Sequence, residues 1–325
     1  MRGYKNILIT GAAGFIGSHT AEKFLQRGCN VIGFDNFDSF YPREIKERNL
    51  KTALAVKNFS FIEGDITKIS DLEKLPAEID LVIHLAAKAG VRPSIENPSA
   101  YINTNINGTQ NILEWMRKRK ISKMIFASSS SVYGNNLKVP FSETDNVDFP
   151  ISPYAFTKKA CELINHNYHH LYNIDIINLR FFTVYGERQR PDLAIHKFTK
   201  NIFEGKPIPM FGDGSTARDY TYIADIVNGI AASYDYLISH NDVFEIINLG
   251  NSSPVDLKTL IEKIYTATGA TTQIEKLPKQ AGDVERTFAD ISKANFFLNY
   301  EPRTTLDEGL KKFAEWFKSE WRQPQ

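Results

Sequence analysis

The chain has 325 residues, with 39 Lys and Arg against 38 Asp and Glu, a formal net charge of +1, 42% hydrophobic residues and 24% charged residues. These values are ordinary for a globular chain and argue against a disordered protein, a fibre or a disulfide scaffold. The length predicts one large domain or two closely packed domains.

Charge and cysteine patterns exclude several further classes. The densest basic run, Arg117 to Lys120, follows an apparent amphipathic helix, where cations suit the carboxyl end of the helix dipole, so no nucleic-acid partner is expected. Cys29 and Cys161 lack CxxC spacing, which predicts neither a disulfide framework nor a metal site. No stretch approaches the ~18 apolar residues of a membrane span, so we expect a cytoplasmic protein with no membrane partner.

The first half of the chain alternates short apolar runs with longer helix-like segments. This pattern is typical of strand–crossover–strand units and predicts an α/β fold with a doubly wound parallel sheet, the Rossmann topology. The expected strands are Asn6 to Thr10, Asn30 to Phe34, Phe59 to Glu63, Leu81 to Leu85, Lys123 to Ala127 and Asp175 to Arg180. The expected helices are Phe15 to Arg27, Arg43 to Ala55, Ile69 to Lys74, Ser99 to Lys118 and Pro153 to Leu171.

The regular alternation breaks after about Tyr185 into Gly- and Pro-rich pieces, such as Gly205 to Gly214, with helices near Leu193 to Phe203 and Val255 to Thr268. We expect a dinucleotide-binding domain over residues 1–185, to which some later segments return. Residues 186–325 are expected to form mainly a smaller α/β lobe for the substrate.

A glycine-rich turn joins the first expected strand to the first expected helix. Gly11, Gly14 and Gly17 stand at every third position, which permits a tight turn and close approach of a pyrophosphate to the helix amino terminus. Phe15 and Ile16 lie between Gly14 and Gly17 and are expected to contact the cofactor as well. A Gly-rich turn alone is often only a turn, so the prediction of a bound dinucleotide also depends on its context.

The ends of the next strands supply that context. Asp35 follows the glycines by ~20 residues, where a dinucleotide fold places its ribose-diol acceptor, and its negative charge favours NAD over NADP. Asp65 falls where such folds meet the adenine, and His84 ends the fourth strand beside the expected pyrophosphate, as a ligand or as a buried structural residue. The remaining cofactor contacts are expected at Ile66, Leu85, Ala86 and Ala87.

Four consecutive serines, Ser128 to Ser131, leave the fifth expected strand at its carboxyl end, where open α/β sheets place ligands. Downstream, Tyr154 and Lys158 are four residues apart, which puts the phenol and the ammonium on one helix face. An ammonium stabilises a phenolate and brings the pKa of a tyrosine toward neutrality. The pattern therefore indicates proton transfer by Tyr154 coupled to hydride transfer to nicotinamide, rather than a turn and a solvated helix face.

These motifs, in this order, resemble the extended short-chain dehydrogenase/reductase family over Lys5 to about Phe317. Three stretches, 86–94, 180–192 and 212–222, are similar to the UDP-glucuronate 4-epimerase group. The resemblance implies an enzyme in which Ser129 is the catalytic serine, Tyr154 the acid/base and Lys158 its partner. It also implies that NAD stays bound through the cycle, and that helices Ser99 to Lys118 and Pro153 to Leu171 pair two subunits in a homodimer.

The resemblance assigns further residues to the nucleotide sugar. Lys88 and Asn103 are expected near the cofactor or substrate, and Arg218 and Asp283 near the diphosphate and ribose. Phe198, Pro209 and Phe211 either flank the uracil or belong to the core. Two positions depart from the family pattern: Gln280 replaces a common arginine, which leaves diphosphate neutralisation to Arg218 with Arg286, and Glu187 replaces a common proline.

The implied reaction is inversion at C4 of a UDP-sugar through a 4-keto intermediate. Ser130, Ser131 and Thr183 offer hydroxyls, and Arg92 and Arg190 cations, for the carboxylate of UDP-glucuronate, the favoured substrate that would become UDP-galacturonate. The serines lack the acid/base groups that dehydratases need beside the catalytic hydroxyl. UDP-glucose or a UDP-N-acetylhexosamine remains an alternative substrate, and a non-catalytic NAD-sensing protein remains an alternative class.

Overall fold

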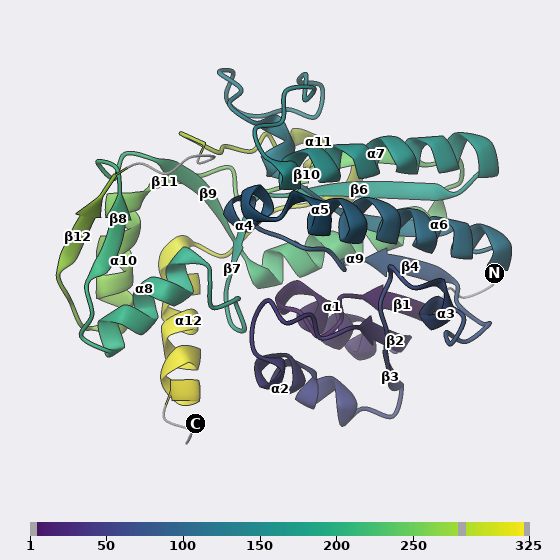
Figure 1. The fold of residues 1–325 in the computed structure, drawn as a ribbon, viewed down its shortest axis with the longest axis horizontal. Helices are drawn as coiled ribbons and strands as arrows, with labels where there is room; N and C mark the ends of the chain where they lie inside the picture. Colours follow the sequence, from purple (N-terminus) through teal and green to yellow (C-terminus); the bar gives the residue numbers. More distant parts are fainter. Residues whose placement is uncertain (1–4, 279–283, 322–325) are drawn as a thin grey trace.

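The computed structural model describes residues 5–278 and 284–321. Within them, the central layer is a seven-stranded sheet with the order β10-β6-β5-β4-β1-β2-β3 (Figure 1). All of its strand pairs are parallel, which confirms the predicted doubly wound fold. The strands are β1 (Asn6–Thr10), β2 (Asn30–Asp35), β3 (Phe59–Glu63), β4 (Leu81–His84), β5 (Lys123–Ser129), β6 (Asp175–Phe181) and β10 (Phe244–Leu249).

The sheet is buried on both faces, as a parallel sheet must be. Alternate residues of β1 show this: Ile7 and Ile9 join one hydrophobic core, and Leu8 joins the other. The first core packs under α1 (Phe15–Gln26) and α9 (Ile223–Ser239), and α2 (Arg43–Leu54) packs on α1. The second core packs under α3 (Ile69–Leu72), α6 (Gly108–Arg119) and α7 (Pro153–Tyr172).

Local chemistry explains where α7 begins and ends. The side chain of Ser152 accepts a hydrogen bond from Ala155 N, and Pro153 stands at the first helical position, where its missing N–H costs nothing. The helix stops where Asn173 adopts the left-handed conformation, with φ of 53°. This helix carries Tyr154 and Lys158 toward the carboxyl end of the sheet.

The expected helix Ser99 to Lys118 is instead divided into α5 (Pro98–Tyr101), a π-helical segment η1 (Ile102–Asn107) and α6. The side chain of Asn105 explains the wider turn, because it binds two other segments. Its Oδ1 accepts from Lys88 N at 2.8 Å, and its Nδ2 donates to Lys88 O and to Thr157 Oγ1, both at 3.0 Å. A π-helical turn is common next to functional sites, and this one ties the loop after β4 to α7.

The smaller lobe lies beside the carboxyl ends of the large sheet (Figure 1). It contains a three-stranded sheet, β11-β9-β7, and a two-stranded sheet, β12-β8. Its strands are β7 (Thr183–Tyr185), β8 (Ile208–Phe211), β9 (Ala217–Tyr222), β11 (Pro254–Asp256) and β12 (Ile274–Leu277). Its helices are α8 (Ala194–Phe203), α10 (Leu257–Thr268) and α12 (Leu306–Trp321).

Connecting elements complete the described chain. They are α4 (Val91–Glu96), the 3-10 helix η2 (Ser130–Tyr133) and α11 (Ser292–Leu298). Two elements from the second half of the sequence, α9 and β10, belong to the large sheet and its cover. Across residues 5–278 and 284–321, no helix has both the length and the apolar character needed to cross a bilayer.

Candidate active site

A cavity of ≈ 750 Å³ opens at the carboxyl ends of β1, β4 and β5, where the strand order reverses. Reversal points of open parallel sheets are the places where ligands bind. Most of the residues predicted from the sequence line this one cavity. They are Gly11, Gly14, Phe15, Ile16, Gly17, Asp35, Ile66, Leu85, Ala86, Ala87, Lys88, Ser129, Ser130, Ser131, Tyr154, Lys158, Thr183 and Arg190.

Gly11, Gly14 and Gly17 of the glycine turn line the cavity. Gly11 has a φ of +71°, and a Cβ there would lie 2.8 Å from Ala86 N. A Cβ on Gly17 would lie 2.0 Å from Gly11 O, so neither position accepts a side chain. Helix α1 begins directly after Gly14 with no side-chain cap and no acidic residue in its first turn. Its free amino end therefore suits a diphosphate.

Asp35 lies at the end of β2 beside this turn. Its Oδ2 accepts from Ala13 N at 3.1 Å and its Oδ1 accepts from Phe37 N at 2.8 Å. Burial raises the pKa of this carboxyl, while the hydrogen bond from Phe37 N and the charge of Lys46 oppose the increase. Each carboxylate oxygen keeps acceptor capacity for a ribose hydroxyl. The turn, the helix end and this carboxylate together fit an NAD molecule.

The three predicted catalytic residues meet at the end of β5. Tyr154 and Ser129 both line the cavity, and Ser129 Oγ accepts a hydrogen bond from Ser131 N at 3.1 Å. Lys158 lies one turn further along α7, and its Nζ donates to Ala127 O at 2.7 Å. A phenol, a hydroxyl and an ammonium thus face the same part of the cavity.

The pKa values of this group differ in part from the expectation. Burial raises the pKa of Tyr154, and the neighbouring Ser129 and the charge of Arg190 only partly oppose that increase. The expected lowering by Lys158 is absent because its ammonium is directed at Ala127 O. Burial lowers the pKa of Lys158 itself to about 8. His84 is buried between Thr10 and Thr109, and burial lowers its pKa to about 3, so it is a neutral structural residue.

Of the two arginines predicted to bind a carboxylate, only Arg190 lines the cavity. Its guanidinium pairs with Asp192 at 2.6 Å, lies over the Phe40 ring at 5.0 Å and donates to Ala89 O at 3.4 Å. Arg92 is exposed on α4, with its guanidinium 5.0 Å from the ring centroid of Phe211 in the smaller lobe.

The other predicted ligand residues lie away from the cavity lining. Asp65 binds Thr67 and Asn36 through its carboxylate, and Asn103 accepts from Asn107 on η1. Phe198 and Pro209 are buried in the smaller lobe. The Arg218 guanidinium donates to Ala217 O at 2.9 Å. The backbone of Arg286 forms an isolated parallel β-bridge with Ala217. Asp283 lies outside the described residues.

Sequence reasoning missed other parts of the lining, notably Asp38, Tyr41, Lys46, Tyr101 and Phe181. Lys88 Nζ pairs with Asp38 Oδ2 at 2.8 Å at the cavity wall. The Tyr101 ring lies edge-on to the Tyr154 ring with centroids 6.3 Å apart, and burial raises the pKa of Tyr101 to about 12. Apart from Phe181, which lies in the stretch 180–192, none of these residues stands in a motif, so only the fold brings them to the site.

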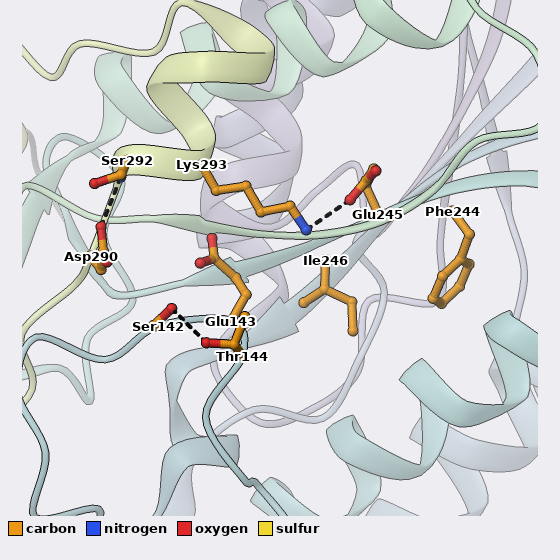
Figure 2. A pocket seen from close by; sticks show the side chains of 9 residues that line it. All are labelled: Ser142, Glu143, Thr144, Phe244, Glu245, Ile246, Asp290, Ser292 and Lys293. Carbon is orange, nitrogen blue, oxygen red and sulfur yellow. Dashed lines mark hydrogen bonds and ion pairs between the residues drawn. The ribbon is translucent and has the colours of Figure 1, made fainter.

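A second hollow of ≈ 390 Å³ lies at the open edge of β10, where Lys293 pairs with Glu245 at 2.7 Å (Figure 2). It also contains Glu143, whose carboxylate accepts from Asn248 N at 2.8 Å. None of the residues predicted to bind a ligand lines it. Across the described part of the chain, no group of three or more His, Cys, Asp or Glu side chains is placed to hold a metal ion.

Comparisons with known proteins agree with this geometry. Residues 8–313 match the family described as GDP-mannose 4,6 dehydratase. The UDP-glucuronate 4-epimerase of Thermodesulfobacterium geofontis is 45% identical over 96% of this chain and 95% of its own length. The Bacillus cereus UDP-glucuronic acid 4-epimerase, solved with UDP-glucuronic acid and NAD, is 39% identical with a TM-score of 0.92, covering 97% of this chain and 99% of that one.

A further similar structure acts on a different sugar. The Thermotoga maritima UDP-glucose 4-epimerase, solved with UDP-glucose, is 33% identical with a TM-score of 0.89, and the match covers 98% of this chain and 100% of that chain.

Proposed function

Because this chain belongs to the GDP-mannose 4,6 dehydratase family, within the extended short-chain dehydrogenases/reductases, we propose that it is an NAD-dependent 4-epimerase of a UDP-sugar and that this sugar is UDP-glucuronate. One observation carries the proposal. Tyr154 and Ser129 line the same cavity as the glycine turn. An acid/base group for an alcohol therefore lies within the binding site of a hydride acceptor.

The chain's own residues supply binding and proton transfer. The cavity lined by the glycine turn and Asp35 would hold NAD, which would supply a reversible hydride acceptor for C4 and the positive charge of an oxidised nicotinamide ring. Ser129 Oγ holds the C4 oxygen, while Tyr154 Oη takes the proton of the C4 hydroxyl and later gives it back. Arg190 stabilises the phenolate, since its charge lowers the pKa of Tyr154. Lys158, protonated below its pKa of about 8, donates to Ala127 O and holds α7 at the end of β5.

The choice of a uronic acid rests on the groups next to the trio. Ser130, Ser131 and Thr183 line the cavity beside Ser129 and offer hydroxyl donors for a carboxylate. Arg190 also lines the cavity and pairs with Asp192 at 2.6 Å. A 4-ketouronate is a β-keto acid that loses carbon dioxide when its carboxylate bond aligns with the ketone. Hydroxyls that fix the carboxylate out of that alignment protect the product.

The direct test is incubation of the pure protein with UDP-glucuronate and no added NAD, with the sugar products separated by chromatography. UDP-galacturonate is the expected product, and Tyr154→Phe is the inactive control. UDP-glucose and UDP-N-acetylglucosamine are run in parallel. Faster turnover of either would replace the substrate assignment, a UDP-pentose product would indicate decarboxylation, and undiminished function of Tyr154→Phe would favour an NAD sensor.

We also propose that two copies associate through α6 and α7. Helix α7 supports this proposal because it leaves apolar side chains exposed, including Phe156, Leu163 and Leu171, with 42%, 59% and 54% of their surfaces accessible. A helical bundle with a second copy would bury these side chains. Sedimentation velocity is expected to give a dimer, and a monomer at micromolar concentration would contradict the pairing.

A cytoplasmic location completes the proposal. Both cysteines, Cys29 and Cys161, are free and buried, which agrees with a reducing compartment. Fractionation of cells that make the protein is expected to recover it with cytoplasmic enzymes, and recovery in an oxidising compartment would overturn this part of the proposal.

A further inference from the structure

A buried ion pair lies directly behind the active-site trio. Arg180 on β6 and Glu162 on α7 are joined by two hydrogen bonds, Nε to Oε1 at 2.9 Å and Nη2 to Oε2 at 2.8 Å. Arg180 is 1% exposed and Glu162 is 2% exposed. Two parallel bonds of this kind fix the relative orientation of the two side chains as well as their distance.

The pair joins α7, which carries Tyr154 and Lys158, to β6, which neighbours the strand β5 that ends in Ser129. Tyr154, Lys158 and Glu162 follow one another at spacings of four on α7, so they share the face turned toward the sheet. Glu162 Oε1 also accepts from Ser128 Oγ at 2.6 Å. Ser128 directly precedes Ser129, and its Cα partner across the β5–β6 ladder is Arg180.

The polar contacts continue to the edge of the sheet. The Arg180 guanidinium lies 4.9 Å from the ring centroid of Tyr133, and the Tyr133 hydroxyl donates to Asn248 Oδ1 on β10 at 2.7 Å. Tyr133 ends η2, the turn that begins with Ser130. The ion pair is thus in contact with both sides of the serine run.

A second buried ion pair joins β5 to β6 at the amino ends of these strands. Lys123 Nζ and Asp175 Oδ2 are 2.8 Å apart, with side chains 2% and 9% exposed, and they are Cα partners in the same ladder. This pair joins strand to strand and lies at the amino ends, away from the cavity. A buried ion pair often adds little stability over apolar residues of similar size, so stability alone does not account for the charges beside Lys158.

We propose that Glu162 and Arg180 are positioning residues of the reaction, which hold the end of β5 against α7 so that the Ser129 hydroxyl meets Tyr154 and which place a negative charge behind Lys158. The inference rests on the proposed epimerase function. Neither residue lines the cavity, so both act through Ser128, Ser129 and Lys158. Displacement of reacting groups by about 1 Å is enough to cost roughly a hundredfold in rate.

The charges around Lys158 predict that loss of Glu162 changes the pKa of the lysine. The titratable groups that face it are Tyr154, Cys161 and Glu162 on α7 and the neutral His84 on β4, with Arg180 behind Glu162. Burial lowers the pKa of Lys158, while Cys161 and Glu162 oppose that lowering. Loss of the Glu162 charge therefore lowers the pKa of Lys158 further, and the ammonium is lost at a lower pH.

The test compares Glu162→Gln with Asp175→Asn as a matched control, both as full-length protein with bound NAD. Each substitution removes one carboxylate from a buried ion pair that includes a residue of β6. Glu162→Gln is expected to lower kcat about tenfold to a hundredfold with little change in KM, and to move the alkaline limb of the kcat profile to lower pH by about one unit. Asp175→Asn is expected to keep the wild-type kcat per folded molecule and the wild-type pH profile.

A readout that does not need the reaction separates this inference from the proposed function. The pH dependence of Lys158 acetylation by acetic anhydride, followed by peptide mass spectrometry, reports its protonation directly. The midpoint is expected at lower pH in Glu162→Gln and unchanged in Asp175→Asn. An unchanged midpoint in Glu162→Gln overturns the inference, whatever the activity, and so does an equal change in both variants.

A milder variant covers the case in which Glu162→Gln does not fold. Ser128→Ala keeps the ion pair and removes only its contact with β5. It is expected to fold, to lower kcat several-fold and to leave KM unchanged. A wild-type kcat in Ser128→Ala overturns the positioning of Ser129 through this contact.

Discussion

The buried ammonium of Lys158 is expected to cost the folded protein stability, and Lys158→Met tests this. Burial lowers the pKa of Lys158 from 10.5 to about 8, which corresponds to roughly 3 kcal/mol at about 1.4 kcal/mol per pH unit. The variant also loses the bond from Nζ to Ala127 O at 2.7 Å, worth about 1 kcal/mol. At pH 7 we expect Lys158→Met to be inactive and about 2 kcal/mol more stable than the wild type.

The pH dependence of this difference gives the sharper test. Below pH 8 the lysine is protonated in both the folded and the unfolded wild type, so the full penalty is present. Between pH 8 and 10.5 the folded protein loses this proton before the unfolded chain does, so the wild type gains stability relative to the variant as pH rises. Above 10.5 the penalty is gone. Titrating groups that do not interact with Lys158 cancel in the difference, whereas Cys161, whose pKa the charge of Lys158 lowers, contributes to it.

Urea unfolding of nucleotide-stripped protein, followed by tryptophan fluorescence at several pH values, measures both quantities. The reasoning is refuted if the wild type is the more stable protein at pH 7, or if the difference between the two proteins stays constant from pH 7 to 10.5. Equal slopes of the unfolding free energy against urea are required for the comparison, because a changed slope indicates a changed unfolded or folded state.

Three further predictions concern the cofactor and the chemistry. Tyr154→Phe is expected to lower kcat by a factor of about 100 to 10,000, with NAD content and melting temperature nearly unchanged; loss of NAD would instead indicate a binding role. Gly17→Ala is expected to abolish NAD binding in equilibrium dialysis, because the added Cβ would lie 2.0 Å from Gly11 O, and retained binding would contradict the close-turn geometry. Asp35→Asn is expected to weaken NAD binding by about tenfold while improving the ratio of NADP to NAD affinity, measured by isothermal titration; an unchanged ratio would remove Asp35 from cofactor selection.

The sequence predicted the parts of the fold that depend on local pattern. The strand Asn6–Thr10 has the predicted bounds, because a buried parallel strand is an apolar run between turn residues. The strand Phe59–Glu63 also has the predicted bounds, although it lies at the edge of the sheet and contains no buried residue. Gly11, Gly14 and Gly17 were recognisable because the turn itself demands residues without a side chain. The break in the helix predicted at Ser99 to Lys118 was not recognisable from the sequence, because it follows from contacts of Asn105 with distant segments.

The candidate site likewise contains residues that sequence spacing predicts and residues that only the packing of the fold brings together. Tyr154 and Lys158 are neighbours on one helix, so their spacing alone placed them together. Arg180 and Glu162 meet only because β6 and α7 pack on β5, and no spacing indicates that contact. The raised pKa of Tyr154 was likewise unpredictable, because it depends on burial of the phenol and on the direction of the Lys158 side chain.

Strand β10 has a consequence for synthesis of the chain. It is the edge neighbour of β6, yet β7, α8, β8, β9 and α9 all precede it in the sequence. While the ribosome makes these elements, β6 presents an unpaired backbone edge of the kind that recruits other strands. A nascent chain that ends before Phe244 is therefore expected to depend on chaperones, and stalling there to produce aggregates rather than a stable amino-terminal fragment.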